Sequence, residues 1–165
     1  MKYLLIIILI SFKINAQDFS TEIEKSTSEY RQLFLEKNFT SLANFASPKL
    51  IEYLKSKEDL VYLLTELNKN AESKGAKVTN ITIGKNSEIV NHKDQLQCIV
   101  PFTLQMEDDK RKVIFKSGLA LISFDKGKSW CFTFKVEKEQ KLNNEVLDLN
   151  EKIIIPEKTQ TVENK

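Results

Sequence analysis

The stretch Gln95-Leu96-Gln97-Cys98-Ile99-Val100-Pro101-Phe102-Thr103-Leu104-Gln105-Met106 decides the fold. Apolar side chains recur at every second position from Leu96 to Met106, which is the period of a strand with one buried face. Glutamine and threonine occupy much of the other face. In a meander this strand would be flanked by a neighbour on each edge. Pro101 cannot donate a hydrogen bond to such a neighbour, and we expect a local bulge there.

The same alternation continues on both sides of this stretch. Residues 78–83 alternate before it, with a bend expected at Gly84, and residues 113–124 and 130–136 alternate after it. Short polar segments separate these runs, as turns do in a meander. The sequence therefore predicts about four antiparallel strands joined in order along the chain.

The residues before the strands are helical in pattern. A capping box at Thr21 and Glu24 predicts the start of a first helix that runs to about Lys37. A short second helix follows, and Ser47-Pro48 is a typical start for a third. A fourth helix is expected after Ser56, with its end at Gly75. The fold class is therefore α+β, with N-terminal helices packed on a curved antiparallel sheet.

The N-terminus has the pattern of a cleaved secretory signal. Lys2 precedes an unbroken apolar run from Tyr3 to Ile10, and Ala16 offers a small residue at the cleavage point. The run is about half of the roughly 20 residues that a spanning helix needs, so we expect no stable membrane anchor after cleavage. Residues 1–16 are predicted to be the signal peptide, and the product to be periplasmic or secreted.

The rest of the chain fits one domain. Residues 17–156 form a length that can bury a sizeable core without disulfides. Within it, residues 142–149 are expected to form a short helix and Ile153 to Pro156 an apolar strap on the core. The polar residues 157–165 are predicted to be a disordered tail.

The charge balance excludes one class of partner. The chain has 25 basic and 23 acidic residues, and residues 1–16 carry two of the basic ones and no acid, so the exported part is formally neutral. Nucleic-acid binding requires a basic stripe, which the sequence lacks. The Lys- and Asn-rich composition, with a signal that ends in Ala-Gln, resembles exported proteins of the Bacteroidetes type.

One local motif is sharp. Ser123-Phe124-Asp125-Lys126-Gly127-Lys128-Ser129-Trp130 resembles the Asp-box of sialidases and other exported β-proteins. In that family the motif is a hairpin and not a catalytic element. The resemblance implies that Asp125 holds backbone N–H groups of the turn, that Gly127 takes a positive φ and that Trp130 packs beside them. It implies no glycosidase activity.

The order of the expected elements resembles the cystatin-like and nuclear-transport-factor-like α+β fold. In that family, helices lie across a curved sheet and can enclose a pocket. The resemblance implies a pocket here, which we expect to be lined by aromatic residues of the helices and strands: Tyr30, Tyr53, Tyr62, Phe102, Phe132 and Phe134. Some relatives are isomerases or dehydratases and most bind ligands, but no catalytic motif matches this sequence.

Few residues offer chemistry. The apolar face of the sheet carries no carboxylate or imidazole, so a pocket against it would lack a general base. His92 is the single histidine and is expected in an exposed turn near Asp94. Cys98 and Cys131 fall on opposite faces with one strand between them, about 9–10 Å apart. That exceeds the roughly 7 Å limit of a disulfide, so two free thiols are predicted. No spacing suits a metal or a cofactor.

These observations favour an exported, non-enzymatic binding or interaction module. Its partner would be an apolar small molecule in the pocket or another protein on the sheet. The alternative is a small pocket enzyme of the same fold, an isomerase, dehydratase or hydrolase, which would need a buried acid or histidine facing the sheet. A third hypothesis, a purely structural or inhibitory surface protein, predicts a filled core without a cavity.

Overall fold

A computed structural model describes residues 19–165 and shows an α+β fold. The predicted signal peptide lies outside these residues. The helices are α1 (Ser20–Leu35), α2 (Phe39–Leu42), the 3₁₀ turn η1 (Ala43–Phe45), α3 (Pro48–Leu54), α4 (Lys57–Glu72) and α5 (Gln140–Leu147). The strands are β1 (Lys77–Ile83), β2 (Val90–His92), β3 (Gln95–Glu107), β4 (Arg111–Ser123), β5 (Cys131–Thr133) and β6 (Thr159–Asn164).

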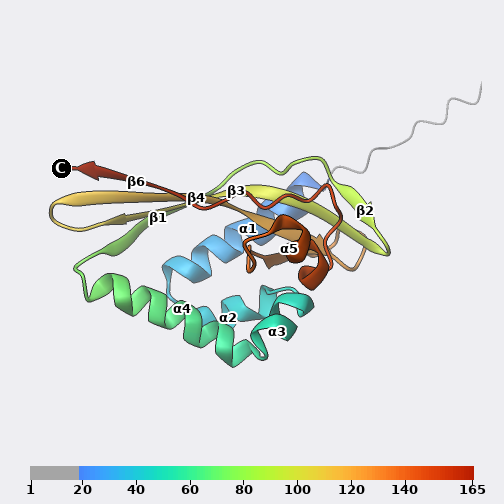
Figure 1. The fold of residues 1–165 in the computed structure, drawn as a ribbon, viewed down its shortest axis with the longest axis horizontal. Coiled ribbons are helices and arrows are strands. Elements are labelled where there is room, and N and C mark those ends of the chain that lie inside the picture. The colour runs from blue at the N-terminus through green and yellow to red at the C-terminus, as the bar shows by residue number, and fades with distance from the viewer. Residues whose placement is uncertain (1–18) are drawn as a thin grey trace, which may run out of the picture.

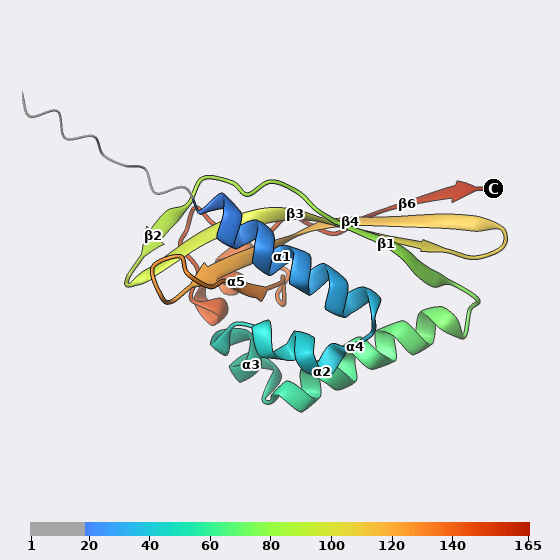
Figure 2. The ribbon, with the colours of Figure 1, turned by 180° about the vertical axis from the view of Figure 1, so that it is seen from behind.

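Helices and sheet form two layers. Figures 1 and 2 show a curled antiparallel sheet above a layer of α2, α3 and α4. Helix α1 lies nearest the viewer in Figure 2, whereas α5 lies nearer the viewer in Figure 1. The four main strands follow the predicted meander order, β1-β3-β4-β5. Among the described residues, no helix is long and apolar enough to cross a membrane.

Two of the predicted helix starts are confirmed. The hydroxyl oxygen of Ser47 accepts a hydrogen bond from the N–H of Leu50, with Pro48 in the first turn, and that of Ser56 accepts one from Asp59. Such caps satisfy backbone donors that have no partner inside the helix. The prediction of a capping box at Thr21 is wrong. Helix α1 already begins at Ser20, and its N-cap residue, Phe19, makes no side-chain cap hydrogen bond.

The strand that decides the fold is continuous across its proline. Pro101 pairs with Gly118 of β4 without a register shift, so the predicted bulge there is wrong. The Pro101 carbonyl accepts from the Gly84 N–H, 2.8 Å away. In an antiparallel sheet, the backbone nitrogen and carbonyl oxygen of one residue point toward the same neighbouring segment. The proline nitrogen therefore points at residues 84–89, which form no strand. The missing donor therefore interrupts no ladder.

The C-terminal region departs most from expectation. Residues 157–165, predicted to be disordered, include β6, which pairs with the first half of β4 from Arg111 to Lys116. Strand β5 is correspondingly short, and it pairs only with Ala120–Ile122 on the same edge of β4. Between them runs the predicted strap, in which Ile153 and Ile155 are buried.

Candidate functional site: an apolar cleft between sheet and helices

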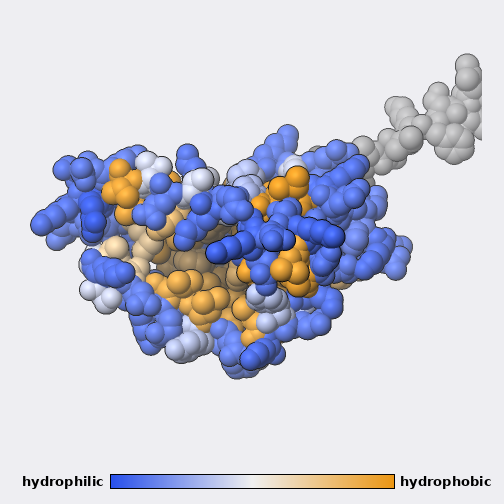
Figure 3. Space-filling model, viewed as in Figure 1, coloured by the Kyte–Doolittle hydropathy of each residue, from blue (hydrophilic) through white to orange (hydrophobic). Residues whose placement is uncertain are grey.

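A cleft of about 890 Å³ lies between the sheet and the helix layer. Figure 3 shows it as a hollow with apolar surface along the α4 side below and hydrophilic surface above and to the right. Its volume falls in the range of about 300–1,000 Å³ that is typical of small-molecule sites. The filled core of the third hypothesis is therefore not what the structure has.

The sheet side of the cleft is built by strand alternation. Phe102, Leu104 and Met106 of β3 point into it. Their direct partners on β4 are Ser117, Phe115 and Val113, which line it too. Because paired residues share a face, the period of two in the sequence becomes a largely apolar wall.

The helix side is contributed mainly by α4. Leu63, Leu64, Leu67 and Ala71 line the cleft, and their spacing places them on one face of the helix. The side chain of Leu67 remains 59% exposed. An apolar side chain so exposed at a cleft edge offers surface that an apolar ligand would cover.

Four of the six predicted pocket residues line the cleft: Tyr30, Phe102, Phe132 and Phe134. Tyr53 and Tyr62 do not. The Tyr53 hydroxyl donates to Glu137 over 2.8 Å, and the Tyr62 side chain is 67% exposed. Spacing within a helix cannot reveal such placements before the helix is docked on the sheet.

The hydroxyl of Tyr30 is not available to a ligand. It donates to the backbone carbonyl of Trp130, and burial raises the pKa of this phenol well above its usual value. The ring packs against Phe45 and Phe132, with centroids 5.2 Å and 5.3 Å away. Tyr30 thus contributes only its ring to the wall.

The acidic residues at the cleft come from connections and not from the faces of the strands. They are Asp108 in the β3–β4 turn, Glu137 after β5 and Glu157 before β6. Glu157 pairs with Lys135, and Glu137 accepts from Tyr53. Hydrogen bonds from the Lys110 N–H, above all, lower the pKa of Asp108. A carboxyl that is stabilised in its charged form is poorly suited to general acid chemistry.

Basic residues dominate the charged part of the lining, and the sequence pattern does not predict this. The sequence predicts a strand at Lys135, no element at Lys138 and a disordered tail at Lys158. Only the pairing of β6 with β4 and the turn of the chain after β5 bring them to the cleft. No local signal in the sequence marks them.

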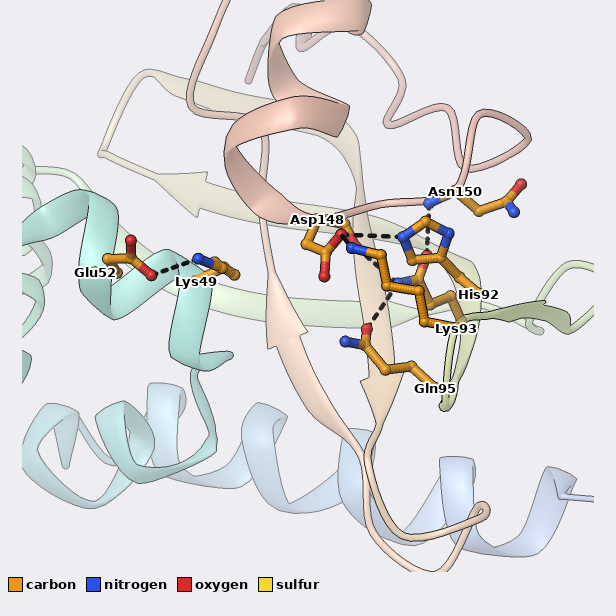
Figure 4. A network of polar contacts seen from close by, with 8 residues as sticks. Lys49, Glu52, His92, Lys93, Gln95, Asp148 and Asn150 are labelled. Carbon is orange, nitrogen blue, oxygen red and sulfur yellow. Dashed lines mark hydrogen bonds and ion pairs between the residues drawn. The ribbon is translucent and has the colours of Figure 1, made fainter.

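His92 lies in a separate polar cluster. Its Nε2 atom is 3.0 Å from Oδ1 of Asp148, and Nζ of Lys93 is 2.6 Å from the same oxygen (Figure 4). Asp94, the partner expected from sequence, is not part of the contact. Gln97 also anchors this segment, because its side chain donates to the Asp148 carbonyl and accepts from the Asn150 N–H. The cluster fastens the end of α5 to the β2–β3 hairpin, and His92 does not line the cleft.

The hairpin at 123–130 has the local contacts that the Asp-box resemblance implies. Asp125 accepts from the N–H and the hydroxyl of Ser129, and these bonds lower its pKa to about 2. Gly127 has φ +89°, and the indole N–H of the buried Trp130 donates to its carbonyl. This is a structural turn, and its loop stands apart from the cleft lining.

The two cysteines and the possible metal ligands are the last groups to place. Cys98 is buried and Cys131 partly buried, and both are free thiols, as predicted. Within residues 19–165, no group of three or more His, Cys, Asp or Glu side chains is arranged to hold a metal ion.

Comparison with known proteins places the chain in no family. No protein-family model matches it, and neither does any curated protein.

Proposed function

We propose that this chain is an exported, non-enzymatic binding module that holds an apolar small molecule in the cleft. The observation that carries the proposal is the cleft itself, a hollow of about 890 Å³ whose strand and helix walls are mostly aliphatic and aromatic. Covering such a surface removes it from water, at about 25 cal/mol per Å² of apolar area. The N-terminal signal pattern supports export, to the periplasm or beyond.

The layout supports the same proposal. Helices that precede an antiparallel meander and leave a hollow against its face resemble the cystatin-like and nuclear-transport-factor-like fold. Most members of that group bind ligands, and the catalytic ones use a pocket acid and a histidine. In this chain His92 lies outside the cleft, and the acids at its rim are engaged with basic or hydroxyl partners. No observation favours the alternative of a small pocket enzyme.

The test is titration of the purified protein with N-phenyl-1-naphthylamine, an uncharged dye that fluoresces in apolar surroundings. We expect saturable enhancement at one site. Leu104→Trp should weaken it by narrowing the cleft, whereas Thr103→Trp, the neighbour on the opposite face of β3, should not. Both variants must first show the wild-type circular dichroism spectrum. Absence of dye binding to the wild type, or equal binding by both variants, would overturn the proposal.

A further inference from the structure

The charges around the cleft are unevenly distributed. Seven lining residues are basic and three are acidic: Arg31, Lys74, Arg111, Lys116, Lys135, Lys138 and Lys158 against Asp108, Glu137 and Glu157. The exported part of the chain is formally neutral. Four surplus positive charges therefore gather at this one feature, and the rest of that part has a matching negative excess. Such a field favours an anion at the cleft.

Part of this charge is already neutralised. Arg111 pairs with Asp108, with Nη2 and Oδ2 3.1 Å apart, and Lys135 pairs with Glu157. Within residues 19–165, neither Lys138 nor Lys158 forms an ion pair, and both are exposed. These two ammonium groups are free to take a ligand anion.

The Lys135–Glu157 pair also gathers these lysines. It ties the connection after β5 to the segment before β6. Lys158 directly follows Glu157 in the chain, and Lys138 lies three residues after Lys135. The Nζ atom of Lys158 is 5.0 Å from the ring centroid of Phe115. Since Phe115 belongs to the apolar wall, this ammonium stands where the wall meets the rim.

The strand and helix walls inside the rim are mainly apolar. The inward positions of β3 are Phe102, Leu104 and Met106, and α4 contributes leucines and an alanine beside two uncharged asparagines, Asn68 and Asn70. A polar group buried against them without a partner would cost about 1–3 kcal/mol. A ligand that suits both parts must therefore be apolar along its length and charged at one end.

We propose that the ligand is an amphiphile with a single apolar chain and an anionic head. The chain lies against Phe102, Leu104 and Phe115, and Lys138 and Lys158 hold the head at the rim. This inference rests on the proposed binding function and adds the sign and place of the ligand's charge. A carboxylate or a phosphate head supplies the same chemistry.

The experiment compares three probes with the same chain length and different heads. Dodecanoate, dodecanol and dodecyltrimethylammonium, each kept below its solubility limit or micelle concentration at pH 8, compete with the bound dye. We expect dodecanoate to displace it best and the ammonium probe worst. The preference should weaken with salt, because exposed charges are screened over about 10 Å at 0.1 M.

Matched variants locate the head site. In Lys138→Ala/Lys158→Ala the affinity for dodecanoate should fall about threefold to tenfold, with dodecanol unchanged. Lys126→Ala/Lys128→Ala removes two exposed lysines from the 123–130 hairpin and should change neither. The charge-conserving variant Lys138→Arg/Lys158→Arg should keep the preference.

The outcomes separate the two proposals. If the dye binds and all three probes displace it equally, the anionic head is overturned while the binding function stands. If the double alanine variant keeps the full preference for dodecanoate, the assignment to Lys138 and Lys158 is overturned. If neither dye nor any probe binds, both proposals fail.

Discussion

The hydroxyl of Tyr30 donates a hydrogen bond to the backbone carbonyl of Trp130, 100 residues further along the chain. Both side chains are almost fully buried. The contact joins α1 to the residue before β5, at the edge of the sheet that the helices cover. It therefore ties the first helix to the last strand of the meander.

Tyr30→Phe removes this bond and leaves the Trp130 carbonyl without its side-chain partner. We expect the free energy of unfolding to fall by about 1–2 kcal/mol, measured by urea denaturation. Dye binding should persist, because the ring remains in the wall. Tyr62→Phe, at an exposed hydroxyl, is the control and should stay within about 0.5 kcal/mol of the wild type. Equal stability of the two variants would contradict the role given to the Tyr30 hydroxyl.

Gly127→Ala tests the hairpin at 123–130. Gly127 has φ +89°, and an added Cβ would lie 2.2 Å from ring carbons of Phe19. Gly75→Ala is matched to it, since Gly75 has φ +77° with nothing within 4 Å of the added atom. We expect Gly75→Ala to cost about 1–2 kcal/mol from backbone strain alone, and Gly127→Ala to cost clearly more. Thermal denaturation of both variants measures the difference, and a smaller loss at Gly127 would show that Phe19 moves aside freely.

Asp148→Asn tests the cluster that holds the end of α5. Hydrogen bonds from Lys93 and His92, that from Lys93 foremost, lower the pKa of Asp148. Such a group adds stability above its unfolded pKa of about 3.9, and this is lost as the pH falls through the lower folded value. Asparagine also tolerates the φ of +53° at this position, so the change isolates the charge.

We therefore expect Asp148→Asn to lower the free energy of unfolding at pH 7 by about 0.5–1 kcal/mol. The gap to the wild type should close as the pH falls below about 4. Asp94→Asn, at an exposed turn position without these contacts, is the control. A gap that stays constant with pH would refute the contribution of the Asp148 charge.

The two thiols should differ in reactivity. Burial raises the pKa of Cys98 to about 12 and also raises that of the less buried Cys131. Because the thiolate is the reactive form, we expect an aromatic disulfide reagent at pH 8 to leave Cys98 unmodified in the folded protein and to modify Cys131 slowly. Both should react in denaturant. A thiol count of zero in denaturant without reductant would reveal a disulfide and contradict the fold.

Much of the fold can be predicted from local patterns in the sequence. The period of two from Leu96 to Met106 predicts β3 and its buried face, because side-chain direction in a strand depends only on position. The caps at Ser47 and Ser56 predict the starts of α3 and α4 for a similar reason: a hydroxyl bonds to backbone three residues away. The cleft wall of Phe102, Phe132 and Phe134 follows from the same alternation.

The predictions from sequence are wrong where the structure of a segment depends on which other segment it packs against. Residues 159–164 are polar and alone would be called disordered, yet they pair with β4 on the edge that the short β5 leaves free. Pro101 predicts a bulge in the strand, but its nitrogen faces a segment that forms no strand, so no ladder hydrogen bond is lost. Tyr53 and Tyr62 are plausible wall residues until the helices are placed on the sheet.

The sequence by itself determined the class of this protein: a signal pattern followed by a formally neutral remainder, helices before an antiparallel meander, and one apolar face along that meander. These properties follow from residue type and spacing, which act over a few positions. The tertiary structure alone decided that the face borders an open cleft and that Lys138 and Lys158 stand at its rim. Those lysines come from segments that meet only because β6 adds to the sheet and Glu157 pairs with Lys135, and contacts of that range leave no trace in local pattern.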